Sequence, residues 1–175
     1  MNMQKLRASL LTLALVSGGG MAGGVAPALA AEPGRQPAAT ASDVAAVRSA
    51  FDAWAAGTGG PFQLLREDAR WTIVGRSAAA GTYANREAFM RQVIAPFNAR
   101  LREPLKPTVR GLYHDGDMVI VLFDARGVAL DGMPYENTYT WYLKMRDGRI
   151  AQSIAFFDSI AFDEFWTRVK PATQP

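Results

Sequence analysis

The sequence predicts an α+β fold, in which N-terminal helices are followed by a curved antiparallel β-sheet, one face of which the helices cover, and then by a C-terminal helix. Two observations predict it. Apolar residues recur at helical spacing in the first half of the chain, whereas they alternate with polar residues after Pro107. The second half also contains three Asp-Gly pairs, each between two strand-like runs, which is a strong signal for tight β-hairpins. These pairs are Asp115-Gly116, Asp131-Gly132 and Asp147-Gly148.

Residues 1–30 have the features of a secretory signal peptide. Lys5 and Arg7 form a basic start, and the apolar run that follows is shorter than the roughly 20 residues that span a bilayer. Ala28-Leu29-Ala30 then fits the small-x-small pattern of a cleavage site. The alternative is an N-terminal anchor that is retained. Cleavage predicts a secreted, periplasmic protein that has no contact with the membrane.

Two further segments are expected after the signal peptide. Residues 31–41 are rich in Pro, Ala, Gly and Thr, which predicts a flexible leader. Residues 42–171 carry the helical and strand patterns, so they are expected to form a single folded domain.

Composition excludes several classes of protein. The 175 residues include no cysteine and one histidine, which excludes disulfide scaffolds, zinc ribbons, iron–sulfur sites and cysteine nucleophiles. Signal cleavage removes two of the 19 basic residues and none of the 16 acidic ones, so the mature chain lacks the basic surface that nucleic acid attracts. No glycine-rich phosphate loop follows a strand. We therefore expect no nucleic-acid partner, no metal and no cofactor.

Three helices are expected before the sheet. Ser42 is a suitable N-cap for the first, which ends at Gly57, and Pro61 fits the first turn of a short second helix. A short strand over residues 71–74 follows. Asn85 can then cap a third helix, whose apolar face is followed by two prolines.

Four long antiparallel strands and a final helix complete the domain. The strands are expected over residues 107–114, 117–130, 133–146 and 149–158. The helix after them carries apolar residues at positions i, i+3, i+4 and i+7, namely Phe162, Phe165, Trp166 and Val169.

Two-residue loops at the second and third Asp-Gly pairs would fix which side chains face one another. They predict three rows on one face of the sheet: Arg126–Asn137–Asp158, Asp124–Tyr139–Phe156 and Leu122–Trp141–Ile154. The opposite face of the strand over residues 133–146 is polar and belongs in water. The covered face would thus be apolar at one end and polar at the other, which is typical of a small-molecule pocket.

Several segments resemble those of a known superfamily. The chain contains WTIVG, AGTYANREAF, PYENTYTWYLKMRDGRI and AFFD followed by a helix. Over about residues 45–170 the chain resembles the SnoaL-like, ketosteroid-isomerase-like (nuclear transport factor 2-like) superfamily. The resemblance implies the cone-shaped α+β barrel, and it implies homodimers, because proteins of this fold commonly dimerise through the outer sheet face. Members include isomerases, cyclases, dehydratases and non-catalytic binding proteins, so the fold does not determine the activity.

The chain departs from the ketosteroid isomerase pattern. That enzyme uses a tyrosine of the first helix, where this chain has Phe51 and Trp54, and an aspartate after the first strand, where this chain has Arg76. The isomerase mechanism is therefore not expected here. One position matches another branch, because Asp158 resembles the acid/base aspartate of the SnoaL-like cyclases.

Three residues are candidates for catalysis. Asp158 is either a general base or the N-cap of the last helix. Asp124 is either a second acid or the partner of Arg126 or Arg110 in an ion pair. Tyr139 either donates a hydrogen bond to a substrate oxygen, as in an oxyanion hole, or is a buried tyrosine bonded to Asp124.

Further residues are candidates for ligand binding. Asn137, Arg126 and Tyr135 lie in or beside the predicted polar rows. The aromatic candidates are Trp54, Trp71, Trp141 and Phe156, with plain core packing as the alternative. The carboxylates of Asp124 and Asp158 could in principle hold a cation, but the positive charge of Arg126, which is predicted beside them, argues against it. We therefore propose no metal ligands.

The residues leave three functions open. The first is an enzyme of the isomerase, cyclase or dehydratase type that moves a proton on a small hydrophobic carbonyl compound, with Asp158 as acid/base. The second is a non-catalytic periplasmic protein that binds a small hydrophobic molecule. The third is a scaffold module that forms a homodimer through the outer sheet face.

Overall fold

The computed structural model describes residues 41–172. The predicted signal peptide, and all but the last residue of the predicted leader, lie outside the described residues. Among the helices of the described part, none is long and apolar enough to cross a membrane.

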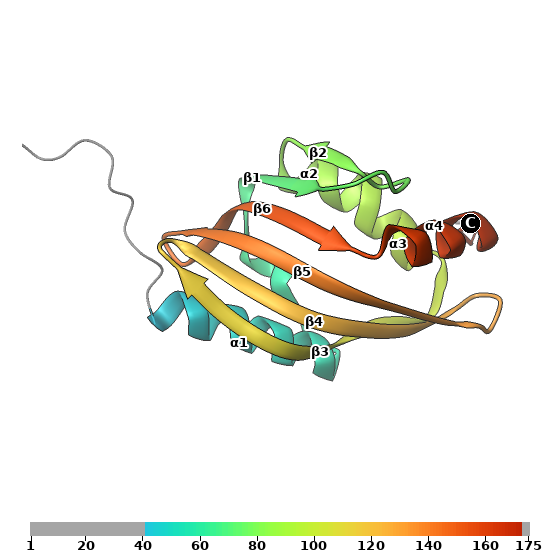
Figure 1. The fold of residues 1–175 in the computed structure, drawn as a ribbon, viewed down its shortest axis with the longest axis horizontal. Coiled ribbons are helices and arrows are strands. Elements are labelled where there is room, and N and C mark those ends of the chain that lie inside the picture. The colour runs from blue at the N-terminus through green and yellow to red at the C-terminus, as the bar shows by residue number, and fades with distance from the viewer. Residues whose placement is uncertain (1–40, 173–175) are drawn as a thin grey trace, which may run out of the picture. The chain divides into compact units, whose positions relative to one another are not determined.

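The described residues form a six-stranded sheet and flanking helices (Figure 1). The helical elements are α1 (Ala41–Ala56), the short 3-10 helix η1 (Pro61–Leu64), α2 (Arg86–Phe89), the π-helical turn η2 (Met90–Ile94), α3 (Ala95–Asn98) and α4 (Ser159–Arg168). The strands are β1 (Leu65–Ile73), β2 (Gly81–Tyr83), β3 (Leu101–Asp115), β4 (Met118–Ala129), β5 (Pro134–Arg146) and β6 (Arg149–Phe157). The predicted fold class is confirmed.

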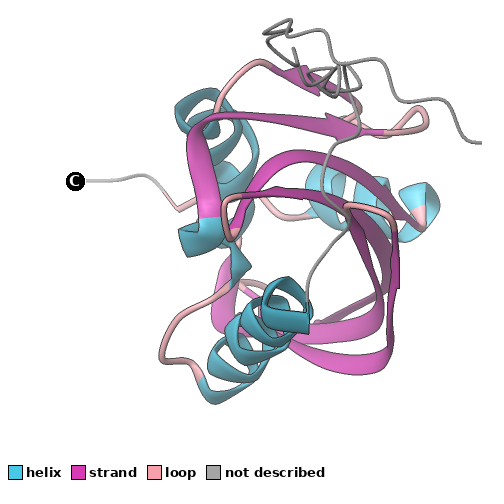
Figure 2. Ribbon diagram, turned by 90° about the vertical axis from the view of Figure 1, so that its left-hand side faces the viewer, coloured by secondary structure: helices cyan, strands magenta, loops and turns pink. Residues whose placement is uncertain are grey.

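The sheet has the strand order β2-β1-β6-β5-β4-β3. All neighbouring strands are antiparallel except β1 and β6, which are parallel. Figure 2 shows how strongly the sheet curls. Because of this curl, α1 lies along β3 and β4 while α2 packs beside β1 at the opposite end of the strand order.

Local sequence explains where the helices begin. The Asn85 side chain accepts a hydrogen bond from the Ala88 amide at 2.8 Å, which caps α2. The predicted third helix is interrupted by the π-helical turn η2. Pro96 follows that turn and has no N–H to donate, so a regular α-helical ladder cannot continue through it.

The β4–β5 hairpin differs from its predicted register. Its loop has three residues, because the Ala129 amide donates to the Met133 carbonyl at 2.9 Å across it. Gly132 ends the loop with a φ of 86°, in the left-handed region that three-residue hairpin loops use at this position. The Asp131 side chain accepts from the Met133 amide at 3.0 Å and stabilises this form.

One extra loop residue moves every side chain of β4 to the other face. Asp124 pairs with Thr138 instead of Tyr139, and Arg126 pairs with Glu136 instead of Asn137. The predicted rows containing Asp124, Arg126 and Leu122 are therefore wrong, and these side chains lie on the outer face. The inward residues of β4 are apolar, namely Val119, Val121, Phe123 and Ala125.

The β5–β6 hairpin begins in the predicted register and then leaves it. Arg146 pairs with Arg149 across the two-residue Asp147-Gly148 loop, whose residues have φ values of 55° and 72°. A β-bulge after the Met145–Ile150 pair then shifts the register by one residue.

The bulge changes the partners at the far end of β6. Tyr139 pairs with Phe157 instead of Phe156, and Trp141 pairs with Ala155 instead of Ile154. Phe156 is exposed on the outer face, where its ring lies 5.9 Å from that of Tyr142. The prediction that Phe156 faces inward is therefore wrong.

The two faces of β5 itself are as predicted. Its inward side chains are buried, namely Tyr135, Asn137, Tyr139, Trp141, Leu143 and Met145. The outward ones are partly or fully exposed. The inner face continues into an aromatic core, in which Trp71 stacks on Phe89 with centroids 4.3 Å apart and Phe51 packs edge-on against Phe123 at 4.9 Å.

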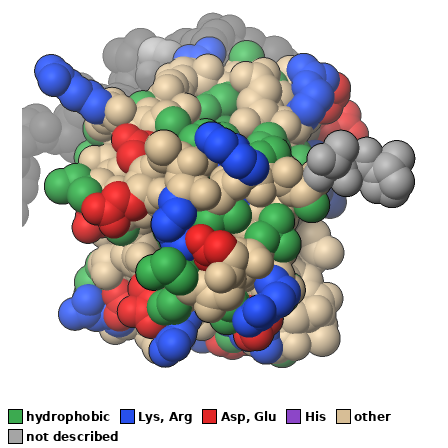
Figure 3. All heavy atoms as spheres, turned by 90° about the vertical axis from the view of Figure 1, so that its right-hand side faces the viewer, with side chains coloured by type: hydrophobic (Ala, Val, Ile, Leu, Met, Phe, Trp, Pro, Cys, Tyr) green, Lys and Arg blue, Asp and Glu red, His purple; other side chains and the backbone are tan. Residues whose placement is uncertain are grey.

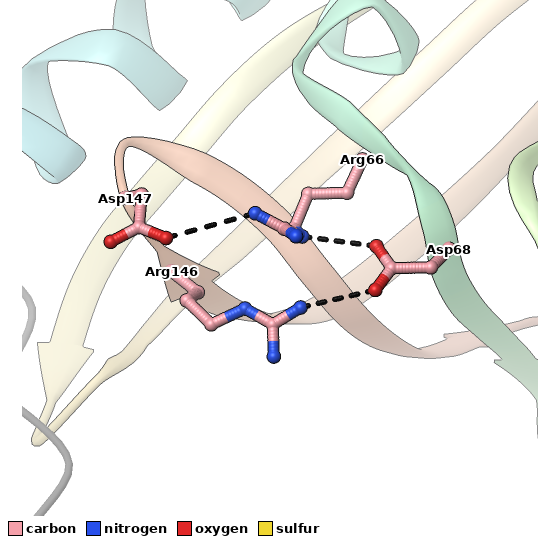
Figure 4. A network of polar contacts seen from close by, with 4 residues as sticks. All are labelled: Arg66, Asp68, Arg146 and Asp147. Atoms are coloured by element: carbon pink, nitrogen blue, oxygen red, sulfur yellow. Dashed lines mark hydrogen bonds and ion pairs between the residues drawn. The ribbon is translucent and has the colours of Figure 1, made fainter.

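An exposed polar network ties the β5–β6 turn to β1 (Figure 4). Asp68 accepts from Arg66 at 3.0 Å and from Arg146 at 3.2 Å, and the second arm of Arg66 reaches Asp147 at 3.7 Å. The hydrogen bond from Arg66 is the main factor that lowers the pKa of the Asp68 carboxyl. These groups lie in water, so the network orients the turn and adds little stability.

Candidate functional site

A cavity of about 550 Å³ lies between the inner face of the sheet and the helices. It lies within the usual size range of small-molecule sites. Most of its lining is apolar, with aromatic side chains from α1, η1, β1, β5, β6 and α4. A mostly apolar cavity of this size can accommodate an apolar compound.

Three tryptophans form the aromatic walls. Trp54 comes from α1, Trp71 from β1 and Trp141 from β5, and all three border the cavity. Trp71 and Trp141 also belong to the buried core, as the core-packing alternative has it, and ligand binding by the three rings stays a prediction. Trp54 and Trp141 are nearly parallel, with an interplanar angle of 15° and centroids 5.9 Å apart. Trp71 meets Trp141 edge-on at 4.9 Å. These distances and angles are those of aromatic rings packed against one another.

Tyr139 is one of four polar side chains in the mostly apolar lining, beside Gln63, Asn98 and Arg102. Its ring stacks on Phe123 at 4.9 Å, and its Oη lies 2.9 Å from the Oη of Tyr135. Tyr135 does not line the cavity, and it packs between Phe97 and Phe165. The predicted partner of Tyr139 was Asp124, which lies on the other face of the sheet.

Asn137 connects this tyrosine pair to the start of α4. Its Nδ2 donates to Tyr135 Oη at 3.0 Å and to the Asp158 carbonyl at 2.9 Å, and the Asp158 amide donates to its Oδ1 at 3.0 Å. The predicted proximity of Asn137 and Asp158 is thus confirmed. The contact is made by the backbone of Asp158, and its carboxylate takes no part.

Burial moves the pKa of both tyrosines further above neutral pH. It raises the pKa of Tyr139 well above the usual range and that of Tyr135 to about 12, the latter also through the nearby negative charge of Asp158. Both hydroxyls are therefore protonated at neutral pH and act as hydrogen-bond donors.

The Asp158 carboxylate caps α4. Its Oδ1 accepts from the Ile160 amide at 2.9 Å and from the Ala161 amide at 3.3 Å. The side chain is exposed and does not line the cavity. The N-cap alternative therefore describes the observed contacts, and a role as acid/base stays a prediction.

The two other charged candidates lie on the outer face. Asp124 accepts from the Thr138 hydroxyl at 2.7 Å and lies 3.6 Å from Arg110, which matches the ion-pair alternative. Arg126 pairs with Glu136 at 3.2 Å. Neither residue lines the cavity, so the predicted charged end of the inner face is replaced by the neutral Tyr135, Asn137 and Tyr139.

Several lining residues were not among the candidates predicted from the sequence. Phe89, Val93 and Phe97 lie on the predicted third helix, and their helical spacing is the signal that marks them. Arg102 contributes the one charged side chain in the lining that the structure describes, yet no motif marks it. Between residues 41 and 172, no group of three or more His, Asp or Glu residues could hold a metal ion.

Charges are mixed at the end of the domain that carries α4 and the β4–β5 loop. Figure 3 shows Lys and Arg interspersed there with Asp, Glu and small hydrophobic patches. The exposed apolar residues near this end include Leu130, Met133 and Ile160. Arg168 and Asp131 form an ion pair between α4 and the loop. Neither positive nor negative charge therefore dominates this face.

Comparisons with known proteins identify the family. The family model described as the SnoaL-like domain matches residues 38–153, more than half of the chain. Bal32a, from a soil-derived mobile gene cassette, is similar at 24% identity and a TM-score of 0.60, covering 71% of this chain and 96% of that one.

Two further solved structures are similar. An NTF2-like protein of unknown function from Burkholderia pseudomallei has 17% identity and a TM-score of 0.61, covering 73% of this chain and 99% of its own. TerC, which was co-crystallised with polyporic acid, has 19% identity and a TM-score of 0.59, again with 73% and 99% coverage. The search of curated proteins found no match. At these identities the solved structures show the fold alone, and the family model shows that the chain belongs to the SnoaL-like family.

Proposed function

We propose that this protein binds a small, planar, apolar molecule in its cavity and does not transform it. The observation that carries the proposal is the cavity itself, in which three tryptophan rings form the walls and no carboxylate lies among the described lining residues. Burial of the ligand against these rings provides the driving force, since binding removes apolar surface from water on both sides.

The lining offers no base for proton transfer. An acid/base catalyst must lie within hydrogen-bond reach of the proton that it moves, directly or through one water. The titratable groups of the described lining are Tyr139 and Arg102. The raised pKa of Tyr139 keeps it protonated at neutral pH, and a guanidinium group does not act as a base. The chemistry of the cavity thus favours binding.

A tryptophan fluorescence titration tests the proposal. Three of the four tryptophans line the cavity, and Trp166 does not, so Trp166→Phe leaves cavity reporters only. We expect planar aromatic compounds to quench this emission saturably and to raise the Tm of the wild-type protein. A panel of planar aromatics and steroids that neither quenches the variant nor shifts the wild-type Tm would contradict the proposal.

Proton transfer by Asp158 is the second candidate function. One observation favours it, namely that Asp158 directly follows Phe157, which lines the cavity. To act on a ligand, the carboxylate would have to give up its hydrogen bonds to the first turn of α4. Asp158→Asn keeps a good capping group and removes the base. Loss of a detected turnover in this variant, with ligand affinity unchanged, would favour the enzyme over the binding protein.

The place of action follows from the predicted signal peptide. If residues 1–30 direct export, the cavity operates in the periplasm on a hydrophobic compound that reaches this compartment. Fractionation of expressing cells, with the mature N-terminus determined by mass spectrometry, tests this step.

A further inference from the structure

The lining of the cavity changes character between its floor and its rim. The floor consists of buried apolar side chains, among them Trp71 and Trp141. Three polar lining residues are exposed and form the rim, and each comes from a different element: Gln63 from η1, Asn98 from α3 and Arg102 from β3. The cavity therefore meets water at a polar rim. A ligand that fills it would be apolar at one end and polar at the other.

Arg102 gives the rim a positive charge, and the fold uses little of that charge. Arg100, two residues earlier, is buried, and its Nε and Nη1 donate to the carbonyls of Val169 and Pro96 at 2.9 and 2.7 Å. Within residues 41–172, Arg102 has one polar side-chain partner, Glu103, at 3.7 Å, and both side chains are more than half exposed. Such an ion pair contributes little and is readily exchanged. The Arg102 guanidinium is thus available to a ligand.

The chemistry of the rim favours a ligand with one carboxylate group. A guanidinium donates two parallel hydrogen bonds to a carboxylate, and the side-chain amides of Gln63 and Asn98 are further donors. A single cation at the rim matches a single negative charge. No aspartate or glutamate lies in the described lining, so no lining carboxylate opposes the anion.

We propose that the cavity binds planar aromatic monocarboxylates, with the ring system against the tryptophans and the carboxylate at the rim on Arg102. This inference rests on the proposed binding function and names the class of ligand, since the apolar ring system now carries one anionic group. Burial of the rings drives binding, whereas Arg102 distinguishes the anion from a neutral compound of the same shape. Arg102 is therefore a specificity-determining residue.

The anion 2-naphthoate and its amide, 2-naphthamide, form a suitable pair of probes, because they share ring and shape and only the first is charged at neutral pH. Equilibrium dialysis gives both dissociation constants for the wild type, Arg102→Gln and the control Arg110→Gln. Arg110 lies on the same strand with a similar exposure, 55% against 57%, but it pairs with Asp124 on the outer face. We expect Arg102→Gln to lower the preference for 2-naphthoate about fivefold, the size of a strong exposed ion pair, and Arg110→Gln to leave it unchanged.

Glu103→Gln should gain affinity for the anion, a result that partial unfolding cannot produce. The substitution removes the carboxylate that competes for Arg102, so the preference for 2-naphthoate should rise about twofold. The matched control is Glu136→Gln, since Glu136 has a similar exposure, 61% against 64%, and lies on the outer face. No rise in Glu103→Gln, or an equal rise in both variants, overturns the assignment to Arg102.

Salt dependence gives an independent readout on the wild type. The preference for 2-naphthoate should fall as sodium chloride is raised to about 1 M, because salt screens exposed charges, whereas binding of 2-naphthamide should not weaken. Equal affinity for the two probes in the wild type, or an equal preference in wild type and Arg102→Gln, overturns the inference and leaves the binding function standing. Binding of neither probe contradicts both.

Discussion

The two faces of β5 carry polar groups that are stabilised in different ways. On the inner face, Asn137, Tyr135 and Tyr139 hydrogen-bond to one another and to the backbone of Asp158. On the outer face, Thr138 donates to Asp124, and Glu136 pairs with Arg126, with all four side chains at least partly in water.

The fold keeps neutral polar groups beside the apolar cavity and leaves charged groups in contact with water. The inner set is neutral, so its burial requires hydrogen bonds and no counter-charge. The outer set is charged and solvated, and its pairs contribute little to stability. The comparison predicts that equal truncations on the two faces will have unequal effects.

The largest contrast is expected for apolar truncation. Leu143 is fully buried on the inner face, and Leu143→Ala should lower the free energy of unfolding by about 2–5 kcal/mol. Its neighbour Tyr142 is partly exposed on the outer face, and Tyr142→Ala should cost about 1 kcal/mol or less. Urea unfolding of both variants measures the difference. Equal losses would show that the outer face is covered by a partner.

The next largest effect is a pH dependence of stability that arises on the inner face. The folded pKa of Tyr135, about 12, lies above the unfolded value of 10. Above pH 10 the unfolded state releases its proton first, so stability is intact below pH 10 and is lost as pH rises towards 12. The loss from this residue should be roughly 2–3 kcal/mol, at about 1.4 kcal/mol for each pH unit.

Tyr135→Phe provides the control for this loss. The variant should unfold with a shallower alkaline dependence than the wild type. Denaturant titrations at pH 9 to 12 measure the slopes. Identical slopes for wild type and Tyr135→Phe would contradict the assignment.

A smaller contrast is expected for the polar groups themselves. Asn137→Ala leaves the Asp158 amide and carbonyl without their side-chain partners, which should cost about 1–3 kcal/mol. Thr138→Ala removes an exposed hydrogen bond to Asp124 and should change stability by less than about 0.5 kcal/mol. Thermal unfolding distinguishes the two. A cost for Asn137→Ala as small as that for Thr138→Ala would mean that water replaces the amide.

The same strands show what could be predicted from the sequence. Which residues of β5 face inward depends on period-two alternation alone, and the alternation predicted Asn137, Tyr139 and Trp141 correctly. Partners across the sheet depend in addition on loop length. Asp131-Gly132 is equally compatible with a two-residue loop and with the end of a three-residue loop, and the structure has the second.

The partners of the residues along β6 were also predicted wrongly. The loop at Asp147-Gly148 was predicted correctly, but the bulge next to Met145–Ile150 has no signature among the residues around it. It moved Phe156 outward and left Asp158 at the start of α4. The inward positions of Tyr139 and Trp141 could be predicted because they depend on alternation within one strand. The predicted charged end was wrong because it depended on the registers of two hairpins at once.

The smallest expected effect concerns the residue on which the two proposed functions differ. Asp158→Ala removes the acceptor for the Ile160 and Ala161 amides and should cost about 1 kcal/mol, while Asp158→Asn should stay within a few tenths, because asparagine is an equally good cap. Thermal unfolding at pH 7 measures both. If the carboxylate were held in strain for catalysis, its replacement by asparagine would stabilise the protein. A stabilised Asp158→Asn variant would therefore favour proton transfer, and an unchanged one would assign the carboxylate to the helix.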